Sequence, residues 1–500
     1  MLAAAGDPTD DDETRRLLPL KAAAEARGAS VSDKLAFAEA LWSHFRFNEA
    51  LTEFEKAAEC EPSNAVPLLL AAKRLFALGR VAESGQFLSR ALERSPQESS
   101  TRRMLGEILA RQGKHVEAEA LAREALRENP ADVRAARALA NILRAAGRIE
   151  EATALLRQHL IDYPGKESWR IQYELAACLD RIGDYEGAIA ALLTAKAQLR
   201  PLSQPLLNQW QARTRRREEF AHALNEQTLR RWSEAASRLH RVCPLAILAG
   251  HPRSGTTLLE RMLAAHPQIV TTDEMGILRP QFIDPIVMAA DTTRAAVAEI
   301  DAFDLDQLEV GRAVYFRGTE AHVGEPFFGR TLIEKDPLAT CDLGFMLRLL
   351  PEARVIFPLR DPRDVCVSFF FTLLPLNPDS APALDLASTC EAAAVSLRLW
   401  KHWRSVMPQA WAEVRYERLV QAPRDELMPL MKMLELPWEE RMLARRAPSE
   451  RRAIRSPTYA DVAEPLYTRA IGRWRHYARW LEPHLESLTP LLNEFGYESC

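Results

Sequence analysis

The chain has 500 residues, of which 47% are hydrophobic, and its formal net charge is -4. It is too long for one ordinary domain, and its balanced charge gives no support for nucleic-acid binding. No apolar run reaches the roughly 18 residues of a membrane span, and the first residues are acidic from Asp7 to Glu13 rather than ordered like a secretory signal.

The first half of the chain repeats with a period of 34 residues. Four prolines and three series of small residues keep this interval. They are Pro62, Pro96, Pro130 and Pro164; Ala38, Ala72, Gly106 and Ala140; Ala50, Ser84, Ala118 and Ala152; and Ala57, Ala91 and Ala125. Small residues allow two helices to approach closely, and a proline suits the end of the second helix. Gly79, Gly113 and Gly147 suit the turn between the two helices.

This pattern predicts about five two-helix units over residues 31–198, and it resembles the tetratricopeptide repeat. The fifth unit continues with Gly183, Ala188 and Ala195, shifted by two residues. Arrays of this family stack into a curved solenoid with a concave groove. We expect the groove to bind a partner or a substrate. The alternative is that the array shields or dimerises the rest of the chain.

Two flanking segments complete the N-terminal half. Residues 1–30 are expected to form an acidic tail and a leading helix, and residues 199–243 a helical connector. The connector carries a basic run from Arg213 to Arg217, followed at once by Glu218 and Glu219. A run of this kind indicates a solvated helix face, and we assign it no chemistry.

The pattern changes after Cys243, where residues 244–500 are expected to form a second domain. Apolar runs at 244–249 and 354–359 indicate strands, and the stretches at 257–265 and 365–374 indicate helices. Strands that alternate with helices predict an α/β domain with a parallel sheet. Ligands of such sheets lie at the carboxyl ends of the strands. The fold class is therefore an all-α repeat solenoid followed by a P-loop-like α/β domain.

A glycine loop, residues 250–257, connects the first strand to its helix, a setting in which backbone N–H groups bind phosphate. The spacing is that of a Walker A loop, but Thr256 stands in place of the lysine. That lysine and a magnesium ion neutralise phosphate charge in NTP chemistry. A sulfuryl group carries one charge less, so both are less necessary. The hydroxyls of Ser254, Thr256 and Thr257 and the cation of Arg253 can still hold a nucleotide phosphate; the alternative is a structural turn.

The segment Pro252–Leu258 resembles the 5′-phosphosulfate loop of sulfotransferases, in particular of tyrosylprotein sulfotransferases and bacterial repeat-fused sulfotransferases. The similarity continues in order through five further segments. These are His266-Pro267, Glu334–Pro337, Arg354–Ser368, Val414–Glu417 and Gly472–Trp474. The resemblance implies in-line transfer of a sulfuryl group from 3′-phosphoadenosine-5′-phosphosulfate to an acceptor hydroxyl, without a metal ion.

The resemblance also implies roles for single residues. Glu274 matches the general base, with Asp273 as its rival, and Lys335 matches the residue that stabilises the leaving group. The matched donor-binding residues are Arg253, Ser254, Gly255, Thr256, Thr257 and Leu258 in the loop, Arg360 and Ser368 for the 3′-phosphate, and Tyr416, Thr458 and Arg473 near the donor.

Two positions of the matched segments leave alternatives open, and a third residue is unexpected. Tyr416 could equally be a buried structural tyrosine. Arg363 could assist Arg360 or pair with Asp361 or Asp364. Pro358 is unexpected inside a central strand, because proline has no N–H for the ladder.

The acceptor leaves several hypotheses open. A peptide or protein tyrosine delivered by the repeat groove is one expectation, and a carbohydrate or small-molecule hydroxyl is the alternative. A P-loop kinase is a different class, which the missing lysine disfavours. A non-catalytic scaffold is disfavoured by the presence of Glu274, Lys335, Arg253 and Arg360. A repeat array also permits a homodimer.

The seven cysteines are scattered, with no CxxC pair and no neighbouring histidine that would indicate a zinc site. We therefore expect no bound metal. The odd number of cysteines and the absence of a secretory signal together predict a location in the cytoplasm.

Overall fold

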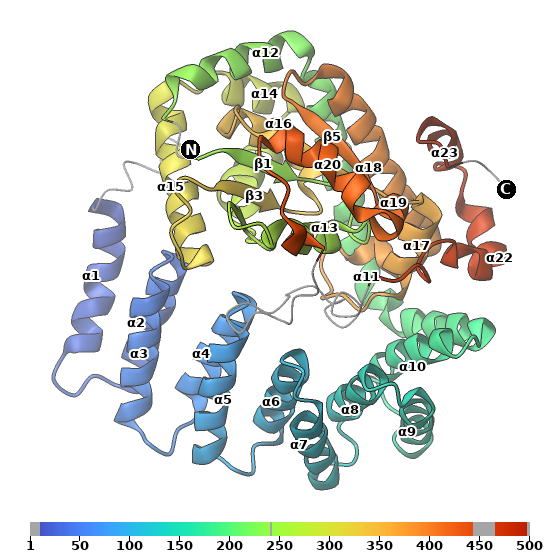
Figure 1. Cartoon of the computed structure of the whole chain (residues 1–500). Coiled ribbons are helices and arrows are strands. Elements are labelled where there is room, and N and C mark those ends of the chain that lie inside the picture. Colours follow the sequence, from blue (N-terminus) through green and yellow to red (C-terminus); the bar gives the residue numbers. More distant parts are fainter. Residues whose placement is uncertain (1–10, 241–242, 444–465, 498–500) are drawn as a thin grey trace. The chain divides into compact units, whose positions relative to one another are not determined.

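The computed structural model of the chain describes residues 11–240, 243–443 and 466–497 (Figure 1). It divides into two compact units, one ending at Pro201 and the other beginning at Leu202, which we call the repeat unit and the sheet unit. No helix among these residues is long and apolar enough to cross a membrane.

The repeat unit consists of antiparallel helix pairs that follow α1 (Asp11–Glu25). The pairs are α2 (Val31–Ser43) with α3 (Phe47–Cys60), α4 (Val66–Ala77) with α5 (Val81–Arg94), α6 (Ser99–Arg111) with α7 (His115–Glu128), α8 (Val133–Ala145) with α9 (Ile149–Asp162), and α10 (Trp169–Arg181) with the start of α11 (Tyr185–Ala223). The predicted helical array is therefore confirmed.

The periodic residues take the positions that their chemistry requires. Gly79, Gly113 and Gly147 have φ angles of 76° to 79° in the turns within three pairs, a conformation that favours glycine. Each of the four periodic prolines lies two residues after the end of a second helix. A Cβ atom at Gly106 would lie 3.3 Å from the carbonyl oxygen of Ala118, which explains the need for small residues where the helices meet.

Helix α11 continues without a break through residue 198, where the sequence predicts the end of the repeats. The domain boundaries at residues 30, 198 and 243 stay predictions. The expectation of a solvated face for its basic run is wrong. Arg217 is 4% exposed, and its Nε lies 3.0 Å from Asp342. Arg213 pairs with Asp284 at 2.7 Å, and Arg216 donates to the carbonyl of Val287 at 3.0 Å. These partners lie about 70 or more residues further along the chain, where a local charge pattern gives no sign of them.

The sheet unit contains a five-stranded parallel sheet in the order β2-β3-β1-β4-β5. The strands are β1 (Leu245–Leu248), β2 (Ile269–Thr271), β3 (Thr331–Lys335), β4 (Arg354–Leu359) and β5 (Trp411–Arg415). The predicted α/β domain with a parallel sheet is thus confirmed.

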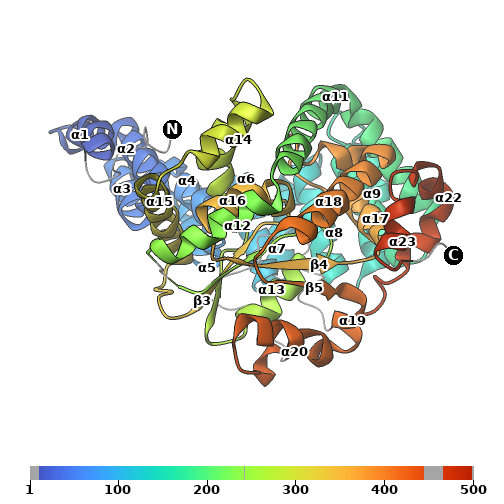
Figure 2. The same ribbon diagram turned by 90° about the horizontal axis from the view of Figure 1, so that it is seen from above.

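Helices cover both faces of this sheet (Figure 2). One face packs on α13 (Thr256–Ala264), α19 (Tyr416–Gln421) and α20 (Pro423–Leu434), and the other is covered by α12 (Glu226–Ala235), α16 (Ala339–Leu349) and α18 (Leu386–Val406). Further helices of the unit are η1 (Ala236–Arg238), the π-helix η2 (Arg279–Met288), α14 (Thr293–Asp301), α15 (Leu305–Val323), α17 (Pro362–Phe371), η3 (Ala381–Leu384), η4 (Glu440–Met442), η5 (Arg473–Tyr477), α22 (Ala478–Leu481), η6 (Glu482–His484) and α23 (Thr489–Glu494).

Pro358 fits the central strand β4 because of where its neighbour β1 ends. The pairing of β4 with β1 ends at Ile356, whose carbonyl accepts the N–H of Ala249 at 3.0 Å. The backbone N–H of Val355 points toward β5 and the carbonyl of Ile356 points toward β1, so the nitrogen of Pro358 also points to the β1 side. At that level β1 has already turned into the glycine loop, and no ladder bond is lost. Its register with Val414 of β5 is retained.

Candidate active site

The predicted site residues gather at the carboxyl edge of the sheet. The glycine loop follows β1, Lys335 is the last residue of β3, and Arg360 directly follows β4. Tyr416 directly follows β5, and Glu274 lies three residues after β2. Because all five strands are parallel, their carboxyl ends lie at one edge, where α/β proteins bind their ligands.

The glycine loop is held in a conformation that few residues adopt. Gly250, Gly255 and even Arg253 have positive φ angles, of 142°, 102° and 78°. The N–H of Gly250 donates to the hydroxyl of Thr340 at 2.9 Å. A Cβ atom at Gly255 would lie 2.8 Å from the Tyr416 ring, so only glycine fits beneath this ring.

Four predicted donor-binding residues contact one another beside the loop. Arg253 Nε donates to the hydroxyl of Ser368 at 3.0 Å, and Arg360 Nη1 donates to the carbonyl of Arg253 at 3.0 Å. The Arg360 guanidinium also lies 4.6 Å from the centre of the Tyr416 ring. Residues more than 100 positions apart in the sequence thus form one cationic cluster.

Two buried polar atoms of the glycine loop and this cluster have no hydrogen-bond partner among the described residues. They are the hydroxyl of Ser254, which is 3% exposed, and Nε of Arg360, which is 7% exposed. A buried group left unpaired costs about 1 to 3 kcal/mol, so such groups call for an explanation. A phosphate-bearing ligand at the N-terminus of α13 would accept from both, and the residues present fit such a ligand.

The other loop residues divide between the site and the core. Thr256 is buried at the first turn of α13 and Thr257 is half-buried. The Leu258 side chain packs against the apolar cluster under the sheet, which leaves its backbone N–H as the group that could reach a ligand.

Next to the loop, Lys335 meets three carboxylates. Its side chain is fully buried, and its Nζ forms a close ion pair with Glu274. Nζ also lies 3.5 Å from Glu260 and 3.9 Å from Asp273. The Glu274 side chain is 40% exposed, whereas that of Glu260 is 5% exposed. Glu274 is therefore the carboxylate of this group that an incoming molecule can reach most easily.

Burial and neighbouring charges shift the pKa values of Lys335 and Glu260 in opposite directions. Burial lowers the pKa of Lys335, but the carboxylates of Glu260, Glu274 and Asp273 outweigh it and raise that pKa above its ordinary value. Burial raises the pKa of Glu260 to about 7, although the Lys335 cation opposes this change. Lys335 therefore stays charged at neutral pH.

The turn that carries Glu274 is strained. Asp273 and Glu274 have φ angles of 46° and 60°, which L-residues rarely adopt. The Asp273 N–H donates to Glu260 Oε1 at 3.0 Å, and the Glu274 N–H donates to the carbonyl of Lys335 at 3.0 Å. Strain of this kind persists where the surroundings hold it, and it is concentrated at functional sites.

The remaining predicted positions have varied surroundings. Arg473 begins η5, and its guanidinium lies 4.4 Å from the centre of the Phe371 ring. Arg363 forms two hydrogen bonds to Asp361, at 3.0 and 2.8 Å. Of the two alternatives given for Arg363, this geometry favours the ion pair with Asp361. Thr458 lies outside the described residues.

Family models match parts of both halves of the chain. Residues 244–440 match the Sulfotransferase family, and residues 35–99 and 109–170 match the Tetratricopeptide repeat. The chain carries tetratricopeptide repeats and a sulfotransferase-family domain. The glycine loop and the Lys335 cluster both lie within the matched part of this domain.

Two curated relatives and one solved structure illustrate the similarity. An uncharacterized protein of Aquifex aeolicus is 27% identical over 49% of this chain and 32% of its own length. A protein-tyrosine sulfotransferase of Drosophila melanogaster is 24% identical over 52% of each chain. The chain thus spans about a third to a half of these relatives. A crystal structure of MamA matches 35% of this chain and 94% of its own, with 14% identity and a TM-score of 0.30.

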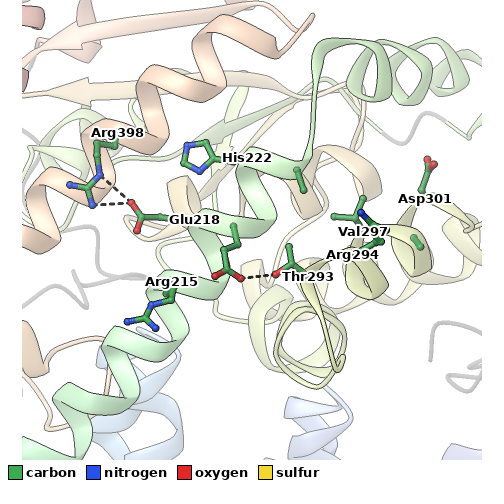
Figure 3. Close-up of a pocket in the computed structure, with 11 residues that line it drawn as sticks. Arg215, Glu218, His222, Thr293, Arg294, Val297, Asp301 and Arg398 are labelled. Carbon is green, nitrogen blue, oxygen red and sulfur yellow. Dashed lines mark hydrogen bonds and ion pairs between the residues drawn. The ribbon is translucent and has the colours of Figure 1, made fainter.

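The sheet unit also contains a pocket (Figure 3). It is lined by parts of α11, α14 and α18, and none of the predicted site residues lines it. Glu218 pairs with Arg398 at 2.9 Å and Glu219 accepts from Thr293 at 2.9 Å, so its walls are linked by their own polar contacts. We therefore place the candidate active site at the glycine loop and Lys335, where the required chemical groups lie, and not at this pocket.

Sequence reasoning missed Glu260 as part of the candidate site. Glu260 lies four residues after Thr256 on α13, which places it on the same face of that helix. A lone carboxylate on a buried helix face was the signal that could have identified it. Its partners, Asp273 and Lys335, are apparent only once the strands are assembled.

Proposed function

We propose that this protein is a sulfotransferase that moves the sulfuryl group of 3′-phosphoadenosine-5′-phosphosulfate to an acceptor hydroxyl. The observation that carries the proposal is the contact of Lys335 with Glu274 at the same sheet edge as the glycine loop. A general base and a leaving-group cation are the two groups that sulfuryl transfer needs beside a phosphate-binding loop.

The loop residues and the cationic cluster would hold the donor. Residues 253–258 would bind the 5′-phosphosulfate through backbone N–H groups, hydroxyls and the Arg253 cation. Arg360 and Ser368 would bind the 3′-phosphate, since an arginine fork and a hydroxyl suit a dianion. Tyr416 lies over Gly255 and against Arg360, where it would bound the donor site. Arg473 and Thr458 stay predicted donor residues.

The transfer would exchange one bond to sulfur for another. The acceptor oxygen attacks sulfur while the bond from sulfur to the bridging oxygen breaks, and the acceptor proton passes to Glu274. The bisphosphate leaving group gains a negative charge on the bridging oxygen, which the Lys335 cation stabilises. Protonation of Glu274 removes one partner of Lys335, and the Nζ donors then turn to the leaving oxygen.

For the acceptor we propose a tyrosine of a peptide or protein, on the strength of relatives named protein-tyrosine sulfotransferases. A carbohydrate or small-molecule hydroxyl is the second candidate. A cytoplasmic location, a homodimer and independence of metal stay predictions.

The repeat unit offers a surface for an acidic peptide. The first helices of successive units pack against one another, α6 on α8 and α8 on α10, so they form the inner side of the array. Three arginines of these helices, Arg103, Arg137 and Arg170, are called the arginine row here. The Nε atom of each is buried and forms no hydrogen bond among the described residues. Two of the three arginines already face a carboxylate: Arg103 Nη1 lies 3.3 Å from Glu107, and Arg170 Nε lies 3.5 Å from Glu167.

Arginines of the row lie close enough to other cations to repel them. Burial lowers the pKa of Arg170, and the neighbouring cations of Arg134 and Arg137 lower it further, although Glu167 opposes them. A bound carboxylate would relieve this repulsion. The row therefore supports an acidic acceptor segment as the ligand of the repeat unit.

The function is tested by calorimetric titration with 3′-phosphoadenosine-5′-phosphate in the absence of metal. We expect tight binding by the full chain and its loss in Arg253→Ala and Arg360→Ala. ATP with magnesium serves as the competing ligand. Preference for ATP with magnesium would indicate a P-loop kinase, and no binding of either nucleotide would indicate a scaffold.

A further inference from the structure

Glu260 connects three parts of the candidate site. Its helix, α13, begins at Thr256, within the glycine loop. Its Oε1 accepts the N–H of Asp273 at 3.0 Å, and its Oε2 lies 3.5 Å from Lys335 Nζ. The Glu260 side chain is 5% exposed and also hydrogen-bonds to Thr271. None of the roles assigned above to the donor, the base or the leaving-group cation uses it.

The first consequence concerns the shape of the turn after β2. Two successive L-residues with positive φ cost about 1 to 3 kcal/mol each, so the turn depends on the bonds that hold it. The Glu260 carboxylate receives the N–H of Asp273, the first of the two strained residues. A loss of this acceptor would leave a backbone donor unpaired directly before Glu274.

The second consequence concerns the charge balance around Lys335. Its ammonium faces Glu260 from α13 and Asp273 and Glu274 from the turn after β2. Glu334 lies next to it on β3 and accepts a hydrogen bond from the hydroxyl of Tyr315, and Arg261 of α13 interacts with Asp273. When Glu274 takes the acceptor proton, Glu260 remains as a buried counter-charge that solvent and acceptor do not reach.

We propose that Glu260 is a positioning residue of this site. It fixes the turn that orients Glu274, and its negative charge compensates the Lys335 cation when Glu274 becomes neutral. The inference rests on the proposed function. It assigns Glu260 no contact with the donor or the acceptor.

Two substitutions separate the two tasks of Glu260. Glu260→Gln keeps an oxygen for the Asp273 N–H but removes the charge. Glu260→Leu removes both. Glu352→Gln is the matched control, because Glu352 also pairs with a buried cation of this unit, Arg312, at 3.0 Å, but precedes β4 at the opposite edge of the sheet.

Sulfuryl transfer to an acidic tyrosine peptide and to 4-nitrophenol tests the charge. We expect Glu260→Gln to lower kcat by about tenfold or more, the size of effect that outer partners have at metal sites, with the KM for the donor nearly unchanged. The pKa of Glu260 is raised to about 7, so wild-type kcat should fall as the pH drops through neutrality and the counter-charge is lost. Glu260→Gln should lack this limb and stay at the low value. A wild-type kcat and pH limb in this variant would overturn the proposal.

Hydrogen exchange of the Asp273 amide tests the turn without reference to activity. We expect faster exchange in Glu260→Leu, near wild-type exchange in Glu260→Gln, and no change in Glu352→Gln. Unchanged exchange in Glu260→Leu would overturn the positioning role. Failure of the proposed function gives a different result, since the wild-type chain would then neither bind the nucleotide nor transfer a sulfuryl group.

Discussion

At the scale of single residues, exposure separates the two adjacent carboxylates of the strained turn. Glu274 has a 40% exposed side chain in close contact with Lys335, and Asp273 has a 20% exposed side chain at 3.9 Å from it. Both have a left-handed backbone, so their side chains leave the turn in fixed directions. The proposed base is therefore distinguished by access and contact rather than by residue type.

Replacement of each carboxylate tests this assignment. Glu274→Gln should lower kcat by about 10² to 10⁴-fold, the usual contribution of a general base. It should leave nucleotide affinity unchanged, because Glu274 lies outside the cationic cluster. Asp273→Asn should cause a much smaller loss. Steady-state kinetics with calorimetric titration would check both, and a larger loss for Asp273→Asn would transfer the role of base to Asp273.

A second buried carboxylate, Glu334, makes stability depend on pH. Burial raises its pKa to about 7, although the hydroxyl of Tyr315 donates to it at 2.8 Å. The folded chain thus holds the proton more tightly than the unfolded chain, and this stability is lost as the pH rises through 7.

Glu334→Gln should therefore be more stable relative to wild type at pH 8 than at pH 5.5, by about 2 kcal/mol from the shift alone. The amide oxygen of the substituted side chain would keep the bond from Tyr315. Denaturant unfolding at the two pH values measures the difference. An equal difference at both pH values would show that Glu334 titrates normally.

At the scale of elements, the glycine loop and the end of β5 depend on each other. Tyr416 directly follows β5, and its ring occupies the space that a side chain at Gly255 would need. The loop conformation is thus set by tertiary contact as well as by its own glycines.

Gly255→Ala should weaken binding of 3′-phosphoadenosine-5′-phosphate by at least about tenfold, because the new methyl meets the Tyr416 ring in a left-handed conformation. Gly324→Ala is the control, since Gly324 has a φ of 72° with nothing within 4 Å of the added atom. It should lower stability by about 1 kcal/mol without changing affinity. Equal affinity in the two variants would mean that the ring does not constrain the loop.

At the scale of the whole molecule, the repeat unit and the sheet unit would contribute different parts of one activity. The sheet unit holds the residues proposed for donor binding and transfer, and the repeat unit holds the arginine row. The two contributions are separable by experiment, because they concern different ligands.

Replacement of the arginine row by alanine should raise the KM for an acidic tyrosine peptide and leave the KM for 4-nitrophenol and nucleotide affinity unchanged. The matched control replaces three exposed arginines of second helices, Arg90, Arg127 and Arg157, with the same loss of charge. A similar rise in the KM for the peptide in both triple variants would show that the effect comes from net charge alone. An unchanged KM in the variant of the arginine row would exclude the row from acceptor binding.

Periodicity and local motifs carried most of what the sequence predicted. The interval of 34 residues indicates helix pairs because close packing requires small residues at Ala38, Ala72 and their equivalents. The glycine loop is readable because its chemistry lies in consecutive residues. The remaining donor residues followed from resemblance to a family, and their roles stay predictions.

Only the tertiary structure decided contacts between distant segments. It turned the basic run of α11 onto Asp342 and Asp284, and it brought Glu260 to the Lys335 ammonium. The physical reason is that the sequence pattern reports which face of a helix or strand is buried, whereas charge pairing depends on which other face it meets. That second choice is made by the order of strands in the sheet and by the packing of helices across it.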